Sequence, residues 1–316
     1  MLVDVALVVA GLVLLVMAGD WLVKGAVNLS LRFGIPALVV SLTVVAFGTS
    51  APEMLVSVAA VLDGAPAIAL GNVIGSNTAN ILLVLGIPAI ISVIHTHETD
   101  TRSDYILMLA ASVLFIIICL LGPITWVHGV VLLIALALVI TKQIRQAMAH
   151  RRDHTDEPEE IEGLEDGISG KKIALYLALG LIGLPIGANF LVSGASDIAR
   201  AFGISEAVIG LTLVAIGTSL PELATSVTAA MKGRADVALG NVIGSNIFNL
   251  LCIIGVASLF GTLPVPPEML RIDLWVMLGA SVLIAPMILK HKPFTRPIGI
   301  GFVAIYLAYI TAIVVV

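Results

Sequence analysis

Long apolar runs recur along nearly the whole of this 316-residue chain, and they constrain its fold more than any other feature. A run of about 18 or more apolar residues is long enough to cross a bilayer as a helix. Only 12% of the residues are charged, about half the share that is typical of soluble domains. We therefore predict an all-α polytopic membrane protein with ten transmembrane helices, at about residues 2–19, 38–62, 67–93, 105–121, 124–141, 173–191, 207–231, 236–260, 272–289 and 297–315.

The only sizeable hydrophilic break is residues 142–172, a mixed-charge stretch between the fifth and sixth spans. We expect a flexible linker there, with one five-helix repeat at 1–141 and a second at 173–316. Because five is odd, the second half enters the membrane upside down. Fourteen of the sixteen Lys and Arg residues then fall on the linker's side of the membrane, and only Arg200 and Arg271 on the other. Lys and Arg concentrate in cytoplasmic loops, so we predict a multi-pass cell-membrane protein with a cytoplasmic linker and both termini extracellular.

The two halves share a repeated segment. Residues 41–86 align without a gap onto residues 210–255, which lie 169 positions later, and 25 of the 46 aligned positions are identical. The identities gather in Gly, Pro, Thr, Ser, Asn and one Glu per copy, in the motifs GTSxPE and GNVIGSN. Polar residues are rare inside membrane helices and mark functional sites. Such an inverted repeat is typical of secondary transporters, whose two halves meet around a site at the bilayer midplane.

Each motif predicts one polar helix face. Pro52 and Pro221 cannot donate a backbone hydrogen bond, so we expect broken helices at the midplane with carbonyls freed beside the breaks. Residues four apart share a helix face. The first motif lines such a face with Thr49, Glu53 and Ser57, flanked by Ser50, and in the second copy with Thr218, Glu222 and Ser226, flanked by Ser219. The second motif lines another face with Asn72, Ser76 and Asn80, and in the second copy with Asn241, Ser245 and Asn249.

The two glutamates need compensation for their charge. A carboxylate at the bilayer centre costs about 2.5–3.5 kcal/mol on insertion scales, and no Lys or Arg lies within the four motif helices near them. Bound cations or protons must then neutralise Glu53 and Glu222. Carboxylates, hydroxyls, amides and freed carbonyls form an all-oxygen ligand set, which suits a hard cation such as Ca²⁺. The lack of Cys and His near the motifs argues against zinc, copper or iron.

The doubled GTSxPE and GNVIGSN motifs resemble those of the cation/calcium exchanger superfamily, specifically the prokaryotic sodium/calcium exchangers, over essentially the whole chain. The resemblance implies a ten-helix fold, exchange of Na⁺ for Ca²⁺, and alternating access by sliding of the first helix of each half against a fixed core. It also implies that Glu53 and Glu222 bind both ions in turn. The other ligands that it implies are Thr49, Ser50, Thr218 and Ser219, the carbonyls of Ala46 and Ala215, and the flanking Ser76, Asn80, Ser245 and Asn249.

One departure from the family bears on the ions. Some relatives have Asp at the position of Asn249, and in the potassium-dependent exchangers that Asp is tied to potassium use, so Asn at both Asn80 and Asn249 argues against potassium cotransport. A Ca²⁺/H⁺ exchanger of the same superfamily remains open, and a cation channel is a more distant alternative. We expect no enzymatic activity, no cofactor apart from the transported Ca²⁺ and Na⁺, no partner other than the lipid bilayer, no nucleic acid, and a monomer as the simplest state.

Overall fold

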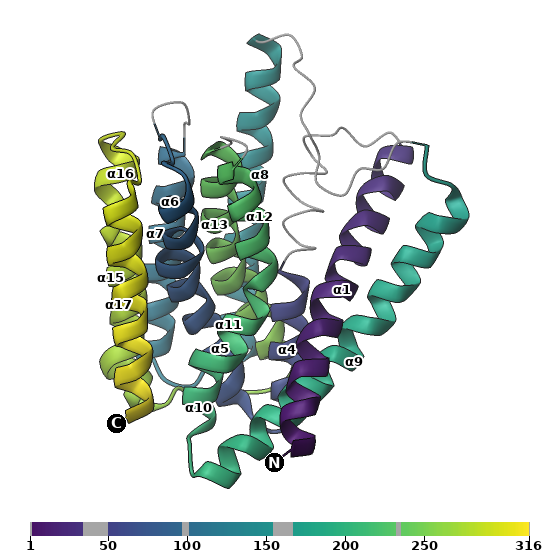
Figure 1. The fold of residues 1–316 in the computed structure, drawn as a ribbon, viewed down its shortest axis with the longest axis vertical. Helices are drawn as coiled ribbons and strands as arrows, with labels where there is room; N and C mark the ends of the chain where they lie inside the picture. Colours follow the sequence, from purple (N-terminus) through teal and green to yellow (C-terminus); the bar gives the residue numbers. More distant parts are fainter. Residues whose placement is uncertain (1, 34–49, 97–100, 154–166, 232–234, 316) are drawn as a thin grey trace.

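The computed structural model describes residues 2–33, 50–96, 101–153, 167–231 and 235–315. Eight helices in these residues are long and apolar enough to cross a membrane, and the bent pair α10–α12 adds a ninth. The remaining predicted span, 38–62, lies partly outside the described residues, and its described part is helix α4. The prediction of an all-α polytopic fold is confirmed (Figure 1).

The helices follow the order of the predicted spans. The first half contains α1 (Leu2–Arg32), α4 (Ala51–Leu62), α5 (Pro66–Ala79), α6 (Gly86–Ile91), α7 (Arg102–Leu120) and α8 (Trp126–Asp153). The second half contains α9 (Gly170–Phe202), α10 (Glu206–Ile209), α11 (Ala215–Thr218), α12 (Leu220–Met231), α13 (Ala235–Phe248), α14 (Ile254–Phe260), α15 (Leu274–Leu283), α16 (Ala285–Leu289) and α17 (Arg296–Val315). Short π-helical segments join some of these: η2 (Asn80–Val84), η3 (Gly210–Val214), η4 (Asn249–Ile253) and η5 (Met269–Asp273).

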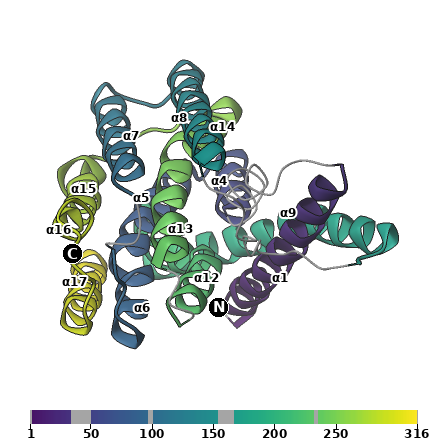
Figure 2. The same cartoon turned by 90° about the horizontal axis from the view of Figure 1, so that it is seen from above.

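Helices α1 and α9 are longer than the predicted spans 2–19 and 173–191. Within the polar end of α1, Lys24 Nζ donates to Asp20 Oδ2 one turn away, at 2.8 Å, and an i,i+4 pair of this kind favours the helix by a few tenths of a kcal/mol. The two helices pack side by side along their length, at one edge of the molecule (Figure 2). Their backbones come close where glycines meet, since a Cβ on Gly11 would lie 2.8 Å from the carbonyl oxygen of Gly187.

The predicted linker 142–172 is partly helical. Helix α8 continues past the apolar span to Asp153, and α9 begins at Gly170. The sequence KQIRQAMA that follows the span consists largely of good helix formers, so the helix propagates beyond the apolar segment. The default expectation of a flexible linker was therefore wrong for the first twelve of these residues. The middle of the linker, residues 154–166, lies outside the described residues.

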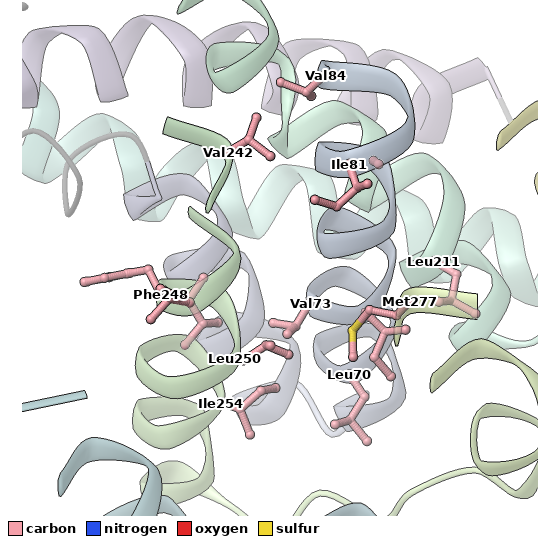
Figure 3. Close-up of a cluster of buried hydrophobic side chains, with 14 of the residues drawn as sticks. Leu70, Val73, Ile81, Val84, Leu211, Val242, Phe248, Leu250, Ile254 and Met277 are labelled. Carbon is pink, nitrogen blue, oxygen red and sulfur yellow. The ribbon is translucent and has the colours of Figure 1, made fainter. Parts of the chain in front are cut away.

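The helices that carry the GNVIGSN motif form the centre of the molecule. Of the most apolar 18-residue windows of the spans, those in Pro66–Ile91 and Val237–Phe260 are 78% buried, against 17% for the window in α8. Apolar side chains from the two central spans, among them Val73 and Leu250, meet in a shared cluster (Figure 3). The polar residues of the motif are thus enclosed by protein on most sides.

Reciprocal contacts join the two halves. The backbone of Ile94 exchanges hydrogen bonds of 3.1 and 2.9 Å with Phe294, and that of Leu263 exchanges two of 2.9 Å with Ile124. Ile94 and Leu263 are equivalent positions of the repeat, 169 residues apart. Backbone hydrogen bonds therefore join the first half to the second at two separate places.

Both chain termini lie at the same end of the molecule (Figure 1). The C-terminal end of α8 and the beginning of α9 lie at the opposite end (Figure 1). The described ends of the chain and the helix ends that flank residues 154–166 therefore lie at opposite ends of the molecule.

Candidate ion-binding site

The GTSxPE motif breaks the helix at its serine. Ser50 has φ −90° and ψ 6° just before α4, and Ser219 has φ −82° and ψ 5° between α11 and α12. Pro52 and Pro221 lie in the first turns that follow, where a missing N–H leaves no helical bond unmade. The break bends α10–α11 against α12 by 41°. The expected proline break is confirmed in the second half, and the serine of the first half has the same backbone conformation.

The two glutamates that follow the breaks come together inside the protein. Glu53 and Glu222 are each 1% exposed, and their carboxylates are close enough for their charges to interact. The Thr218 hydroxyl lies beside the Glu53 carboxylate. Each glutamate is in the first turn of its helix, where free N–H groups and the helix dipole favour negative charge. Helices α4, α5, α12 and α13 contain no Lys or Arg, so none of these four helices offers a countercharge.

The first asparagine of each GNVIGSN motif ties α5 to α4 and α13 to α12. Asn72 Nδ2 donates to the Glu53 carbonyl oxygen at 3.2 Å and to Ser57 Oγ at 3.0 Å. Asn241 Nδ2 makes the same two bonds to Glu222 and Ser226, at 3.2 and 3.1 Å. The sequence placed these asparagines on polar helix faces without including them among the ligands. Their position indicates that they orient the backbone of each glutamate.

The halves also meet at the second break. The Thr218 hydroxyl is 3.0 Å from Asn72 Oδ1 of the other half and 3.0 Å from the carbonyl oxygen of Val214. Ser76 Oγ lies 3.4 Å from the Ala215 carbonyl oxygen. Ser76, Ala215 and Thr218 were all predicted to be ligands, and the structure brings their oxygens to the same junction between α5 and α11.

Several predicted ligand oxygens are buried without a hydrogen-bond partner. Among the described residues this holds for Ser50 Oγ, Glu53 Oε2, Asn80 Oδ1, Ser219 Oγ and Asn249 Oδ1. A buried polar atom without a partner costs about 1–3 kcal/mol, and such atoms are rare in native proteins. All five are oxygens, which are the ligands that hard cations prefer. The donor set therefore fits the ions that the sequence suggested.

The remaining predicted ligands are only partly described. Ser245 lies in α13 and is 5% exposed. Ala46 and Thr49 lie outside the described residues, so their predicted roles stay predictions. In the described parts of the chain, no three His, Cys, Asp or Glu residues cluster as a metal site. The oxygens that the described residues offer beside the two glutamates are those of hydroxyl, amide and carbonyl groups.

The second asparagine of each GNVIGSN motif was not predicted to matter. Asn80 Nδ2 donates to Asn246 Oδ1 at 3.0 Å, a bond that joins the two halves. Asn77 and Asn246 sit five positions after the first asparagine of their motif, away from the i, i+4 face that drew attention. The signal that could have found them is the identity of the whole seven-residue run in both copies.

The comparison with known families agrees with this geometry. The model of the family described as "Sodium/calcium exchanger protein" matches residues 3–145 and 172–315, once for each half. The chain belongs to the sodium/calcium exchanger family. This is a family of membrane transporters.

Relatives of similar length support the assignment to the exchanger family. The chain is 33% identical over 351 aligned positions to the sodium/calcium exchanger MaX1 of Methanosarcina acetivorans, with 98% of each chain covered. It is 38% identical over 297 positions to the inner membrane protein YrbG of Escherichia coli, covering 93% of this chain and 91% of YrbG. The solved structure of the sodium-calcium exchanger NCX_Mj soaked with Na⁺ and Sr²⁺ is 36% identical, with a TM-score of 0.67 and 98% of each chain covered.

Proposed function

We propose that this exchanger is an antiporter that moves Na⁺ one way and Ca²⁺ the other through a single midplane site. The observation that carries the proposal is the buried pair Glu53 and Glu222, one from each half, together with four further predicted ligands whose side-chain oxygens are buried without a hydrogen-bond partner among the described residues. The likeness to MaX1 and NCX_Mj, both named as sodium/calcium exchangers, supports the choice of ions.

The site couples the two ions by competition. Two carboxylates balance the charge of one Ca²⁺, so a bound Ca²⁺ leaves the pair neutral. After Ca²⁺ leaves, the two carboxylates must be neutralised again before the site can open to the other side of the membrane, because an uncompensated charge inside the bilayer is costly. Na⁺ ions that occupy the same oxygens satisfy that need and exclude Ca²⁺. With three Na⁺ per Ca²⁺, one net charge moves per cycle, worth about 2.3 kcal/mol per 100 mV.

The pair α1 and α9 is suited to open and close the site. These helices contact each other through backbone positions such as Gly11 and Gly187, so they can move as a unit. Helix α1 touches both breaks, since a Cβ on Gly19 would lie 3.4 Å from Pro52, and Leu12 packs against Gly217. A slide of the pair would therefore cover one break while uncovering the other.

The domain division and the topology belong to the same proposal. We assign one five-helix repeat to residues 1–141, a linker to 142–172 and the inverted repeat to 173–316, with the linker cytoplasmic and the termini extracellular. The sorting of fourteen Lys and Arg against two supports this orientation. The termini share one end of the molecule (Figure 1), which supports placing both of them on the same side of the membrane.

The test is calcium uptake by proteoliposomes that contain the purified protein. Vesicles loaded with Na⁺ and diluted into Na⁺-free buffer of equal pH should take up ⁴⁵Ca²⁺, and vesicles without the Na⁺ gradient should not. Uptake that needs a pH gradient would show a Ca²⁺/H⁺ exchanger, and uptake that needs no counter-ion would show a channel.

Glu53→Gln should abolish this uptake while the protein still elutes as a folded species in size-exclusion chromatography. The matched control is Asp197→Asn, which neutralises a carboxylate that is 52% exposed on α9 and should leave uptake unchanged. Normal exchange by Glu53→Gln would remove the central carboxylate from the mechanism.

A further inference from the structure

The second asparagine of the GNVIGSN motif, Asn77 in one half and Asn246 in the other, takes no part in the predicted ligand set. Both residues are 1% exposed. Each lies three positions before an amide that was predicted to bind ions, Asn80 or Asn249, and these two amides begin the π-helical segments η2 and η4. Single-turn π-helices inside α-helices occur frequently at functional sites.

The two copies of the motif bond alike at their first asparagine and differently at their second. Asn246 Oδ1 accepts a bond from Asn80 Nδ2 at 3.0 Å, and Asn246 Nδ2 donates to the Asn77 carbonyl oxygen at 3.3 Å. Both bonds cross between the halves. Asn77 Nδ2 instead donates within its own helix to the Val73 carbonyl oxygen at 3.0 Å, and its Oδ1 has no partner among the described residues.

Identical sequences in equivalent positions can bond differently only if their surroundings differ. The seven residues 71–77 and 240–246 are identical, and the bonds of their first asparagines match within 0.1 Å. Directly after the motif the sequences differ, since Thr78 and Ala79 follow Asn77 and Ile247 and Phe248 follow Asn246. We attribute the different bonds of the second asparagine to a difference in conformation between the halves, because the seven residues that include it are the same in both. In transporters built from inverted repeats, one repeat or bundle moves against the other around a fixed site. An exchange of conformations between the two halves would then give the opposite-facing state.

We propose that Asn77 and Asn246 are positioning residues that hold the ion-binding amides in turn. In the conformation described here, Asn246 holds Asn80 across the two halves. In the opposite-facing state Asn77 would hold Asn249, while Asn246 would turn back to the Val242 carbonyl of its own helix. The two states then contain the same set of bonds, so the exchange is balanced in energy. This inference rests on the proposed function, because it needs a site that opens to both sides.

The inference predicts effects confined to one side of the membrane. Asn246→Ala frees Asn80 only in states that face one side, and Asn77→Ala frees Asn249 only in states that face the other. The loss of one neutral hydrogen bond that orients a ligand should weaken apparent Ca²⁺ affinity about 3- to 10-fold. A residue with a merely structural role would change affinity alike from both sides.

The experiment uses right-side-out and inverted membrane vesicles from the same expressing cells. The Ca²⁺ concentration for half-maximal Na⁺-driven ⁴⁵Ca²⁺ uptake is measured in both for the wild type, Asn77→Ala and Asn246→Ala. Each variant should raise that concentration in one vesicle type only, and the two variants should do so in opposite types. Equal shifts in both vesicle types, or no shift, would overturn the inference.

Two further measurements keep the test decisive. If an alanine variant does not fold, the shorter donors Asn77→Ser and Asn246→Ser are measured against the same criterion. In the double variant Asn80→Ala with Asn246→Ala, the loss should not exceed that of Asn80→Ala alone, because Asn246 acts through Asn80. If the wild type shows no Na⁺-driven uptake, the proposed function fails and this inference fails with it. Wild-type exchange without opposite sidedness overturns this inference alone.

Discussion

One of the close contacts between the halves is at Gly75, where α5 lies against η3 and α11. A Cβ at this position would lie 2.6 Å from the Leu211 carbonyl oxygen and 2.7 Å from the Ala215 Cβ. Ordinary contact begins at 3.4 Å, so Gly75→Ala would force the segments apart by about 0.8 Å. The nearest obstacle is backbone, which cannot turn aside as a flexible side chain would.

This separation should affect both stability and ion binding. Overpacking of a close contact typically costs about 1–3 kcal/mol. The adjacent Ser76 hydroxyl is already 3.4 Å from the Ala215 carbonyl oxygen, near the limit of a hydrogen bond. A further 0.8 Å would break this link and displace a carbonyl that we propose as a ligand. We therefore expect a lower melting temperature and an apparent Ca²⁺ affinity weaker by roughly 3- to 10-fold.

The assay compares Gly75→Ala with a matched control, Gly279→Ala. A Cβ on Gly279 in α15 would meet no atom within 4 Å, so the same substitution there should be neutral or slightly stabilising. Melting is followed by size-exclusion chromatography of heated samples, and affinity by ⁴⁵Ca²⁺ uptake. If Gly75→Ala matches the control in both measurements, the close approach of α5 to η3 and α11 does not set the geometry of the site.

Two further predictions concern contacts away from the ion site. Tyr309→Phe removes the 2.8 Å hydrogen bond from the Tyr309 hydroxyl to Asp273 Oδ1, and Asp273 is only 4% exposed. The loss of this bond should lower the free energy of unfolding by about 1–3 kcal/mol and leave the Ca²⁺ affinity unchanged. An unaltered melting temperature would contradict this. Phe294→Ala removes a fully buried ring at the residue that pairs with Ile94. The cavity should lower the free energy of unfolding by about 3–5 kcal/mol. A loss below about 1 kcal/mol in the same melting assay would show that this reciprocal contact is not part of the stable core.

Much of the fold was predictable because membrane helices are specified locally. The apolar runs located the spans, and Pro221 located the break at Ser219. The helix ends were less predictable. Hydropathy ended the first span at residue 19, but the bond between Asp20 and Lys24 helps α1 continue to Arg32. Helical propensity, which hydropathy ignores, carried α8 on to Asp153.

The candidate site was likewise predictable from the sequence only in part. The spacing in the first motif put hydroxyls on the faces that carry Glu53 and Glu222, and the spacing in the second motif put amides on separate faces. The two glutamates do come together. Spacing within one helix could not show the ties between helices, such as Thr218 to Asn72. It also gave no sign of the π-helical turns at Asn80 and Asn249, which depend on how the central helices pack.

The sequence by itself determined that this chain spans the membrane in two inverted halves with a pair of acidic residues at their junction. Those properties follow from local hydrophobicity and from the duplication. Only the tertiary structure decided which polar groups meet, because such contacts join residues as far apart as Asn80 and Asn246. It also gave Asn77 and Asn246 different partners within an identical motif. A hydrogen bond depends on the positions of both partners in space. The repeated sequence gives the same residue types in both halves, but it does not give the positions of the groups that those residues meet.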